Sequence, residues 1–445
     1  MYFKRNIDFE LLNWKNTSDR KPLLLRGARQ VGKSSTVKEF AKHYESFIEV
    51  NFESHKEVHT FFDGNIIPEE ICESLEIFYK TTITKGSTLI FFDEIQSCKH
   101  AINSLRFFYE QIPDLHIIAA GSLLEFTLAD IPSFGVGRIR SMYLYPFSFD
   151  EFLNAIGENK LVSLLDKSGI LKPLLDPFHT QLLKYFKKFL LLGGMPSVVS
   201  AFAQGVGILE CTNRMDDLID SYKDDFSKYK KRVSVSLLTE VLTSVVNQSG
   251  GKFVYSKASL SSKHFQIKEA LLLLIKAGLV IPVTHTSANG LPLGAESNYK
   301  KQKMILIDTG LFQRLLGLDI SEIMFSEEFD TINKGGIAEQ FVGLELLKQM
   351  SCYRRHELFY WHREARNSNA EVDYLIQKGE SIVPIEVKSG RSGSMQSMRL
   401  FMEEKRLSRG IRISTENFSQ INNIDIYPIY SSFRLLTNPL SPTYS

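Results

Sequence analysis

Residues 23–38 read LLLRGARQVGKSSTVK, and this stretch decides the fold class of the chain. It joins a run of leucines to a full G-x-x-x-x-G-K-[ST] motif, and a helical pattern follows. The two motif glycines permit backbone conformations in which amide N–H groups point into one concavity. The positive end of the next helix dipole adds to the same spot. This strand, loop and helix context predicts a phosphate-binding loop.

The predicted phosphate site consists of the motif loop and the first residues of its helix. Its members are Gly27, Ala28, Arg29, Gln30, Val31, Gly32, Lys33, Ser34 and Ser35. Lys33 is expected to bring its ammonium to the β- and γ-phosphates, and the Ser34 hydroxyl is expected to ligate Mg²⁺. The expected cofactors are therefore ATP and Mg²⁺.

Three later stretches add candidate catalytic residues. Residues 88–96 read TLIFFDEIQ, an apolar strand that ends in Asp93 and Glu94. Asp93 is expected to hold Mg²⁺ through water, and Glu94 is expected to activate the attacking water. The next strand ends at Ser122, which is placed either to hydrogen-bond the γ-phosphate or the water from the neighbouring strand, or to cap the following helix. Arg138, before the fifth strand, is expected to meet γ-phosphate charge in the transition state.

Short apolar runs alternate with amphipathic stretches between residue 21 and about residue 150. Such runs are typical of strands buried on both faces, so the pattern predicts an α/β fold with a parallel, doubly wound sheet. Helical patterns follow to about residue 230. The predicted parts are an N-terminal segment 1–20, an ATPase core 21–150, a helical lid and linker 151–230, a winged-helix-like domain 231–330 and a separate α/β domain 331–445.

The winged-helix prediction rests on two helical patterns followed by a hairpin. LVIPVTHT, at 279–286, faces QKMILID, at 302–308, across an Asn289-Gly290 turn signal. Lysines lie near this hairpin and in the helices before it. They could contact phosphates of DNA, although such lysines are more often a solvated face. These lysines are Lys252, Lys257, Lys263, Lys268, Lys300, Lys301 and Lys303.

The C-terminal stretch holds a set of charged residues. If AEVDYLIQ (370–377) and SIVPIEVK (381–388) form a hairpin that turns at Gly379-Glu380, Asp373 faces Glu386 and Glu371 faces Lys388. Opposed carboxylates repel, which favours a cation between them, and hard oxygen ligands suit Mg²⁺ or Mn²⁺. The predicted metal set is Glu339, Asp373 and Glu386 with Lys388. The alternative is a structural ion-pair network without chemistry.

The motif stretches resemble the AAA-type ATPase domain of a large bacterial and archaeal family of predicted ATPases that carry a C-terminal domain of unknown function. LLGGMPSVV (191–199), ILIDTGL (305–311) and GGIAEQFVGLEL (335–346) match further landmarks of that family. The resemblance implies ATP-binding and hydrolysis roles for Lys33, Asp93 and Glu94. The C-terminal set resembles the PD-(D/E)XK arrangement of restriction-endonuclease-like folds, which implies metal-assisted phosphodiester hydrolysis. The alternative function is a signalling or regulatory ATPase with an inactive C-terminal binding module.

Composition limits the remaining possibilities. The chain has 445 residues, with 53 Lys and Arg against 51 Asp and Glu, and this balance disfavours a protein that coats nucleic acid. No apolar stretch reaches the ~18–20 residues of a membrane span. The four cysteines lack metal or disulfide spacing, so a reduced, cytoplasmic protein is expected. A homo-oligomer is possible, since an arginine can act in a neighbouring subunit.

Overall fold

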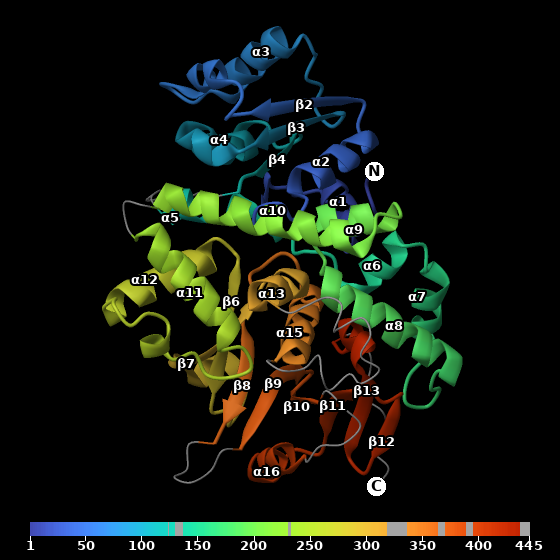
Figure 1. Ribbon diagram of the computed structural model, residues 1–445. Helices are drawn as coiled ribbons and strands as arrows, with labels where there is room; N and C mark the ends of the chain where they lie inside the picture. The colour runs from blue at the N-terminus through green and yellow to red at the C-terminus, as the bar shows by residue number, and fades with distance from the viewer. Residues whose placement is uncertain are drawn as a thin grey trace. The chain divides into compact units, whose positions relative to one another are not determined.

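The computed structural model describes residues 1–122, 124–129, 137–229, 233–317, 336–363, 370–388 and 395–436 (Figure 1). Its Cα positions divide into two compact units. Unit 1 is Met1–Tyr145 together with Lys276–Gly278 and Ser351–Arg355, and unit 2 is Pro146–Ile275, Leu279–Met350 and His356–Ser445. The sequence therefore leaves and re-enters each unit more than once.

Unit 1 is built on a five-stranded sheet in the order β2-β3-β4-β1-β5. Every neighbouring pair in it is parallel, which confirms the parallel sheet predicted from the sequence. The strands are β1 (Leu23–Arg26), β2 (Ser46–Asn51), β3 (Thr88–Asp93), β4 (His116–Ala120) and β5 (Arg140–Tyr143). The helices are α1 (Asn6–Lys15), α2 (Lys33–Phe40), α3 (Pro68–Tyr79), α4 (Lys99–Gln111) and α5 (Leu124–Ala129).

The register of this sheet gathers the ends of its central strands at one edge. Leu23 pairs with Ile118 of β4 on one side and with Arg140 of β5 on the other. In a parallel sheet, the loops that follow the strands all leave from the same edge, the usual place of ligand sites. The loops after β1, β3 and β4, which carry the predicted phosphate and catalytic residues, therefore lie together.

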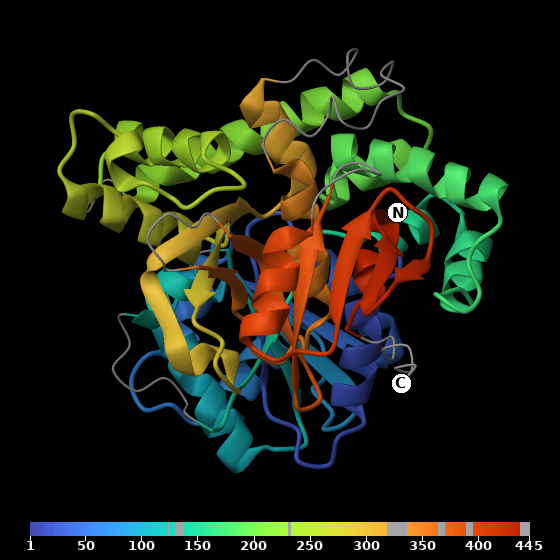
Figure 2. The ribbon, with the colours of Figure 1, turned by 90° about the horizontal axis from the view of Figure 1, so that it is seen from below.

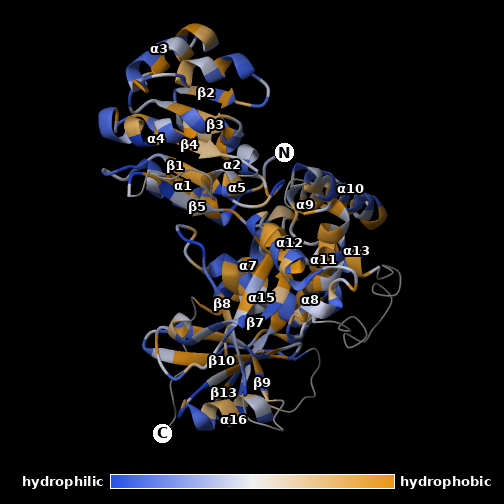
Figure 3. Cartoon of the chain, turned by 90° about the vertical axis from the view of Figure 1, so that its left-hand side faces the viewer, coloured by the Kyte–Doolittle hydropathy of each residue, from blue (hydrophilic) through white to orange (hydrophobic). Residues whose placement is uncertain are grey.

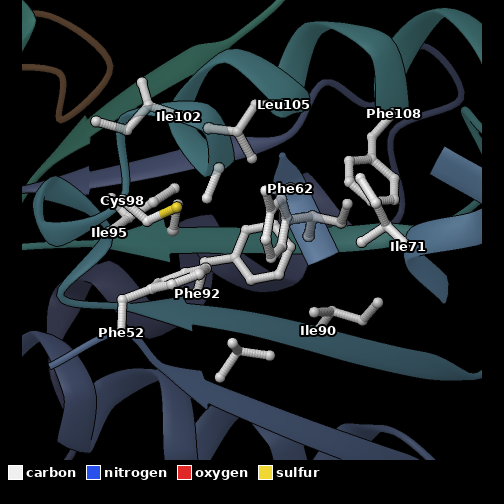
Figure 4. Packing of buried hydrophobic residues seen from close by; sticks show 14 of the residues in the cluster. Phe52, Phe62, Ile71, Ile90, Phe92, Ile95, Cys98, Ile102, Leu105 and Phe108 are labelled. Carbon is white, nitrogen blue, oxygen red and sulfur yellow. The ribbon is translucent and has the colours of Figure 1, made fainter. Parts of the chain in front are cut away.

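One face of the sheet is covered by an aromatic core. Phe52, Phe62 and Phe92 form a triangle with ring centroids 5.4–5.7 Å apart and edge-to-face geometry, the arrangement that the ring quadrupole favours (Figure 4). Ile102 and Leu105 of α4 pack in the same cluster. Colouring by hydropathy shows mostly hydrophobic strands in this sheet, as expected for strands buried on both faces (Figure 3).

Unit 2 begins with helices, as predicted for residues 151–230. They are α6 (Phe149–Ala155), α7 (Asn159–Asp166), α8 (Asp176–Leu192), α9 (Pro196–Ala203), α10 (Ile208–Phe226), α11 (Val235–Asn247) and α12 (His264–Lys276), with α13 (Thr309–Leu316), α15 (Ile337–Gln349) and α16 (Gln396–Glu404) later in the chain. Among the described residues, none of the helices has the length and apolar composition needed to cross a bilayer.

The second sheet has eight strands in the order β12-β13-β11-β10-β9-β8-β6-β7. Its strands are β6 (Val280–Thr286), β7 (Ser297–Leu306), β8 (Leu358–His362), β9 (Glu371–Lys378), β10 (Ser381–Val387), β11 (Gly410–Ser414), β12 (Ser419–Ile421) and β13 (Ile424–Pro428). The predicted antiparallel pairing of β6 with β7 is present. However, β6 also pairs with β8, so one sheet crosses the boundary that the sequence analysis places at residue 330.

Helices cover this second sheet at two places. α16 packs on β9 and β10 (Figures 1 and 2). α15 lies against β7 and β10, and a Cβ added to its Gly343 would collide with the Tyr374 hydroxyl. Glycine at this position therefore allows close approach of the helix to the sheet.

A buried carboxylate joins two glycine-containing stretches in unit 2. Asp308 caps α13 by accepting from Leu311 N–H at 3.0 Å, and it accepts from Gly194 N–H at 2.6 Å. Gly193, which ends α8 with φ 68°, lies so close that an added Cβ would collide with the Asp308 carboxylate. The LLGGMPS and ILIDTGL stretches are therefore parts of one packing contact.

Candidate functional site

The phosphate-binding loop runs from the end of β1 to the start of α2. Gly27 has φ 150°, and a Cβ there would collide with the Leu144 carbonyl oxygen. Gly32 caps α2 in the left-handed region with φ 98°. Both positions therefore need glycine, because a side chain would be strained or blocked. The loop leads directly into the N-terminus of α2, where unpaired N–H groups and the helix dipole favour an anion.

The other predicted loop residues differ in exposure. Ala28 and Val31 are buried and anchor the loop, and Arg29 is half-buried. Gln30, with φ 63°, and Ser35 are exposed. Backbone amides, rather than these side chains, are therefore the groups of the loop that suit phosphate oxygens.

Lys33 lies inside the loop and is only 8% exposed. Its Nζ donates to the carbonyl oxygens of Gly27, at 3.0 Å, and Ala28, at 2.8 Å. Burial lowers the pKa of Lys33 to about 8, against the opposing influence of Glu94 and Asp93. The ammonium is thus held by neutral acceptors, and a polyanion would stabilise its charged form.

Ser34 and Asp93 form the second part of the site. The Ser34 hydroxyl lies 3.1 Å from each carboxylate oxygen of Asp93, which is 7% exposed at the end of β3. Burial, followed by the charge of Glu94, raises the pKa of Asp93. A hydroxyl and a carboxylate within reach of each other are hard oxygen ligands of the kind that Mg²⁺ prefers. These two residues fit the predicted Mg²⁺.

Glu94 has the left-handed backbone conformation, with φ 49°, directly after β3. This conformation is uncommon for glutamate, and such strain is often found at functional positions. Three hydrogen bonds converge on Oε2: from Gln96 Nε2 at 2.6 Å, from Ser122 Oγ at 3.2 Å and from Ser122 N–H at 3.3 Å. Within the described part of the chain, Oε1 accepts no hydrogen bond and remains available as a base.

Gln96 is a site residue that the sequence reasoning missed. Its amide holds Glu94, and its Oε1 lies where a Cβ at Gly121 would be. Glycine in AAGS therefore makes room for the Gln96 side chain. The signal was available in the sequence, since a glutamine two residues after Glu94 can reach back to it within one tight turn.

The structure gives Ser122 a partner that neither predicted role includes, so both roles stay predictions, and it contradicts the expectation for Arg138. Ser122 contacts Glu94, an arrangement that the sequence analysis had not considered. Arg138 forms an ion pair with Glu110 near the end of α4. It lies just before β5, and Arg140 pairs with Leu23 at the start of β1, so Arg138 is at the sheet edge opposite the phosphate loop. Arg138 therefore cannot contact a γ-phosphate bound to its own chain.

The second predicted site shows the expected hairpin register. Ser381 pairs with Lys378 and Ile385 with Tyr374, and one further step sets Glu386 opposite Asp373. The ladder ends there, because Val387 N–H donates to Asp373 Oδ2 at 2.8 Å.

The ladder of β9 and β10 ends before the predicted opposition of Glu371 and Lys388, and these two side chains have other partners. Lys388 Nζ instead donates to Glu386 Oε1 at 2.6 Å, within its own strand. Glu371 is paired with Lys303 of β7.

Lys303 occupies the place that the sequence analysis assigned to a metal. Its Nζ lies 3.2 Å from Glu339 Oε2 and 3.7 Å from Asp373 Oδ1, and it also contacts Glu371 Oε1. Lys303 is 3% exposed, so the expectation that it meets phosphates or solvent is wrong. In the described ranges, no three His, Cys, Asp or Glu side chains are arranged to hold a metal. The residues do not fit the predicted second Mg²⁺ or Mn²⁺.

Comparison with known proteins identifies the first part of the chain. A family model described as an AAA domain matches residues 19–153. Residues 183–322 match a domain of unknown function, DUF8612, and residues 334–431 match a second one, DUF4143. None of the curated proteins matches the chain.

Two proteins of known structure are among the matches to this chain. The Walker-type ATPase PABY2304 of Pyrococcus abyssi is 15% identical, with a TM-score of 0.46, and the match covers 71% of this chain and 96% of that chain. The Orc1 protein of Aeropyrum pernix, solved in complex with DNA, is 11% identical, with a TM-score of 0.29, over 71% of this chain and 93% of that chain. The chain thus contains an AAA ATPase domain at residues 19–153, which implies ATP as its nucleotide, followed by two segments that match domain families of unknown function.

Proposed function

We propose that unit 1 binds ATP with Mg²⁺ and hydrolyses it, and that the C-terminal part binds a partner without cleaving it. The observation that carries the proposal is the meeting of Lys33, Ser34, Asp93 and Glu94 at one sheet edge, with one oxygen of Glu94 held and the other available. A protein that only binds nucleotide would not need a Glu94 carboxylate with one oxygen held and the other available.

The proposed mechanism assigns a task to each of these groups. Loop amides and the Lys33 ammonium hold the β- and γ-phosphates. Ser34 and Asp93 would hold Mg²⁺, which when bound neutralises phosphate charge. Glu94 Oε1 takes a proton from the water that attacks the γ-phosphorus, and the bond to the ADP oxygen breaks. Gln96 and Ser122 keep Oε2 in place, which orients Oε1 toward the water.

The first test of the proposal is Lys33→Ala. We expect ATP affinity to fall about 10- to 100-fold, because a charge-assisted hydrogen bond contributes about 1.5–3 kcal/mol. Titration of the purified protein with a fluorescent ATP analogue in Mg²⁺ measures this. Lys38→Ala, which removes an exposed lysine of the same helix, is the control and should bind like wild type. Unchanged affinity in Lys33→Ala would contradict the assignment of the loop.

A second test uses pH. The folded, nucleotide-free protein has a Lys33 pKa of about 8, lowered by burial. Only the protonated form pairs with phosphate, so ATP affinity is fully present below this pKa. It should fall about tenfold per pH unit above it, until the pKa of the ATP complex is reached. Affinity measured from about pH 7 to about pH 9 checks this, and Lys33→Arg, always charged, should show no such fall. A flat wild-type profile would refute the role of Lys33.

The partner of the C-terminal part is a separate element of the proposal. Exposed lysines in and near α11, α12 and β7 support contact with nucleic acid, as predicted from the sequence, with Lys303 removed from that set. Phosphodiester cleavage is left out, because a lysine stands among the carboxylates that would need a metal. A homo-oligomer also stays a prediction, and Arg138 could reach a γ-phosphate only in a neighbouring copy.

A further inference from the structure

The acidic cluster of unit 2 consists of Glu339, Glu371, Asp373 and Glu386. Its members come from three elements: Glu339 from the first turn of α15, Glu371 and Asp373 from β9, and Glu386 from β10. Asp373 is 8% exposed and Glu386 is 5% exposed. Buried carboxylates in such proximity repel one another unless a cation or protons compensate for their charge.

The cation present is the ammonium of Lys303. It lies 3.2 Å from Glu339 Oε2 and 3.7 Å from Asp373 Oδ1, contacts Glu371, and has the Tyr360 ring 5.2 Å from Nζ. These separations suit ammonium–carboxylate pairs, whereas Mg²⁺ needs oxygens at about 2.0–2.1 Å. Lys303 cannot easily withdraw, since its strand pairs with β6 at Val283.

Lys303 is not the only source of positive charge among the described residues of this cluster. Lys388 adds a second ammonium through its bond to Glu386. Two ammoniums therefore lie among the four carboxyl groups, and each of them contacts at least one carboxyl oxygen.

One carboxylate oxygen in the cluster can still accept a hydrogen bond or a cation. Glu386 Oε2 is buried and has no hydrogen-bond partner among the described residues. An unpaired buried acceptor destabilises the folded state and is rarely retained without a reason. If the ammonium of Lys303 were absent, Asp373 and Glu339 would lose the cation between them, and the repulsion within the cluster would favour a divalent ion, drawn in by rearrangement of these side chains.

We infer that Lys303 is the resident cation of this cluster and keeps divalent metal ions out of it. The likeness to a metal-dependent nuclease thus extends to the carboxylates but not to the metal. The inference does not rest on ATP hydrolysis, because it concerns residues of unit 2 only. It gives a physical reason why the C-terminal part would bind a partner without cutting it.

The test measures Mn²⁺ binding by the nucleotide-free full chain. Binding is measured by calorimetric titration, and the unfolding midpoint is measured with and without millimolar Mn²⁺. In Lys303→Gln we expect one more Mn²⁺ to bind per chain than in wild type, and we expect the unfolding midpoint to rise further on addition of the metal. The double variant Lys303→Gln/Asp373→Asn should lose both effects. Lys300→Gln, an exposed lysine of the same strand, should behave like wild type.

The wild-type protein keeps the inference testable even if Lys303→Gln does not fold. Wild type and Asp373→Asn should show the same Mn²⁺ binding, since the metal does not reach the cluster in either. Wild-type binding that Asp373→Asn abolishes would overturn the inference. A folded Lys303→Gln variant that takes no Mn²⁺ would overturn it as well.

Discussion

Replacing Glu94 by glutamine is expected to lower ATP turnover about 10²- to 10⁴-fold, the range that a positioned general base contributes. ATP affinity should stay within about twofold of wild type, because the phosphates contact the loop and Lys33 rather than Glu94. The substitution is well matched to the geometry. Glutamine can turn its carbonyl oxygen toward Gln96 and Ser122, which preserves their hydrogen bonds, while its amide nitrogen replaces the oxygen that takes the proton.

The measurement is single-turnover phosphate release with saturating ATP and Mg²⁺, alongside nucleotide affinity. Glu110→Gln is the matched control, since Glu110 pairs with Arg138 at the opposite sheet edge and should not affect turnover. If Glu94→Gln releases phosphate as fast as wild type, the proposed hydrolysis at this site is wrong. If it loses ATP affinity instead, Glu94 has a binding role that the geometry does not indicate.

Replacing Gly193 by alanine is expected to destabilise unit 2 by about 3–5 kcal/mol. The backbone of Gly193, with φ 68° and ψ −167°, lies in a region open almost only to glycine, which costs about 1–3 kcal/mol for another residue. In addition, the new Cβ would collide with the buried carboxylate of Asp308, and such overpacking costs about 1–3 kcal/mol. Displacing that carboxylate would also leave the N–H groups of Gly194 and Leu311 without their acceptor.

Chemical denaturation of the full chain, followed by a probe in unit 2, measures this loss. Gly205→Ala is the control, because Gly205 also has a positive φ, of 86°, but a Cβ there meets no atom within 4 Å. It should cost only about 1–2 kcal/mol of backbone strain. Equal losses in the two variants would mean that the contact with Asp308 does not stabilise the unit.

The features that could be predicted from the sequence were those that depend on residues close together in the chain. The motif at residues 27–34 and the apolar run ending at Asp93 predicted the parallel sheet, because period and motif context act over a few residues. The hairpin register of β9 and β10 also followed from local rules, since a turn at Gly379-Glu380 fixes every later pair.

Residues whose partners are distant in sequence were not predictable in this way. The guanidinium of Arg138 could pair with phosphate, yet the parallel pairing of β5 with β1 puts Arg138 at the sheet edge opposite the phosphate loop. Lys303 was predicted to be a surface lysine of a hairpin, because neither strand of that hairpin, β6 or β7, contains an acidic residue that could pair with it. Its partners lie 36 to 70 residues farther along the chain, and only the eight-stranded sheet with α15 brings them to it.

The sequence by itself therefore determined the chemical inventory and the local geometry: a phosphate loop, an acidic strand end, and two opposed carboxylates in a hairpin. The tertiary structure alone decided which charges meet. A side chain's charge is local, but its compensation depends on which other strands and helices pack within a few ångströms of it. For this reason the acidic cluster could be found by reading the chain, whereas the ammonium at its centre could not.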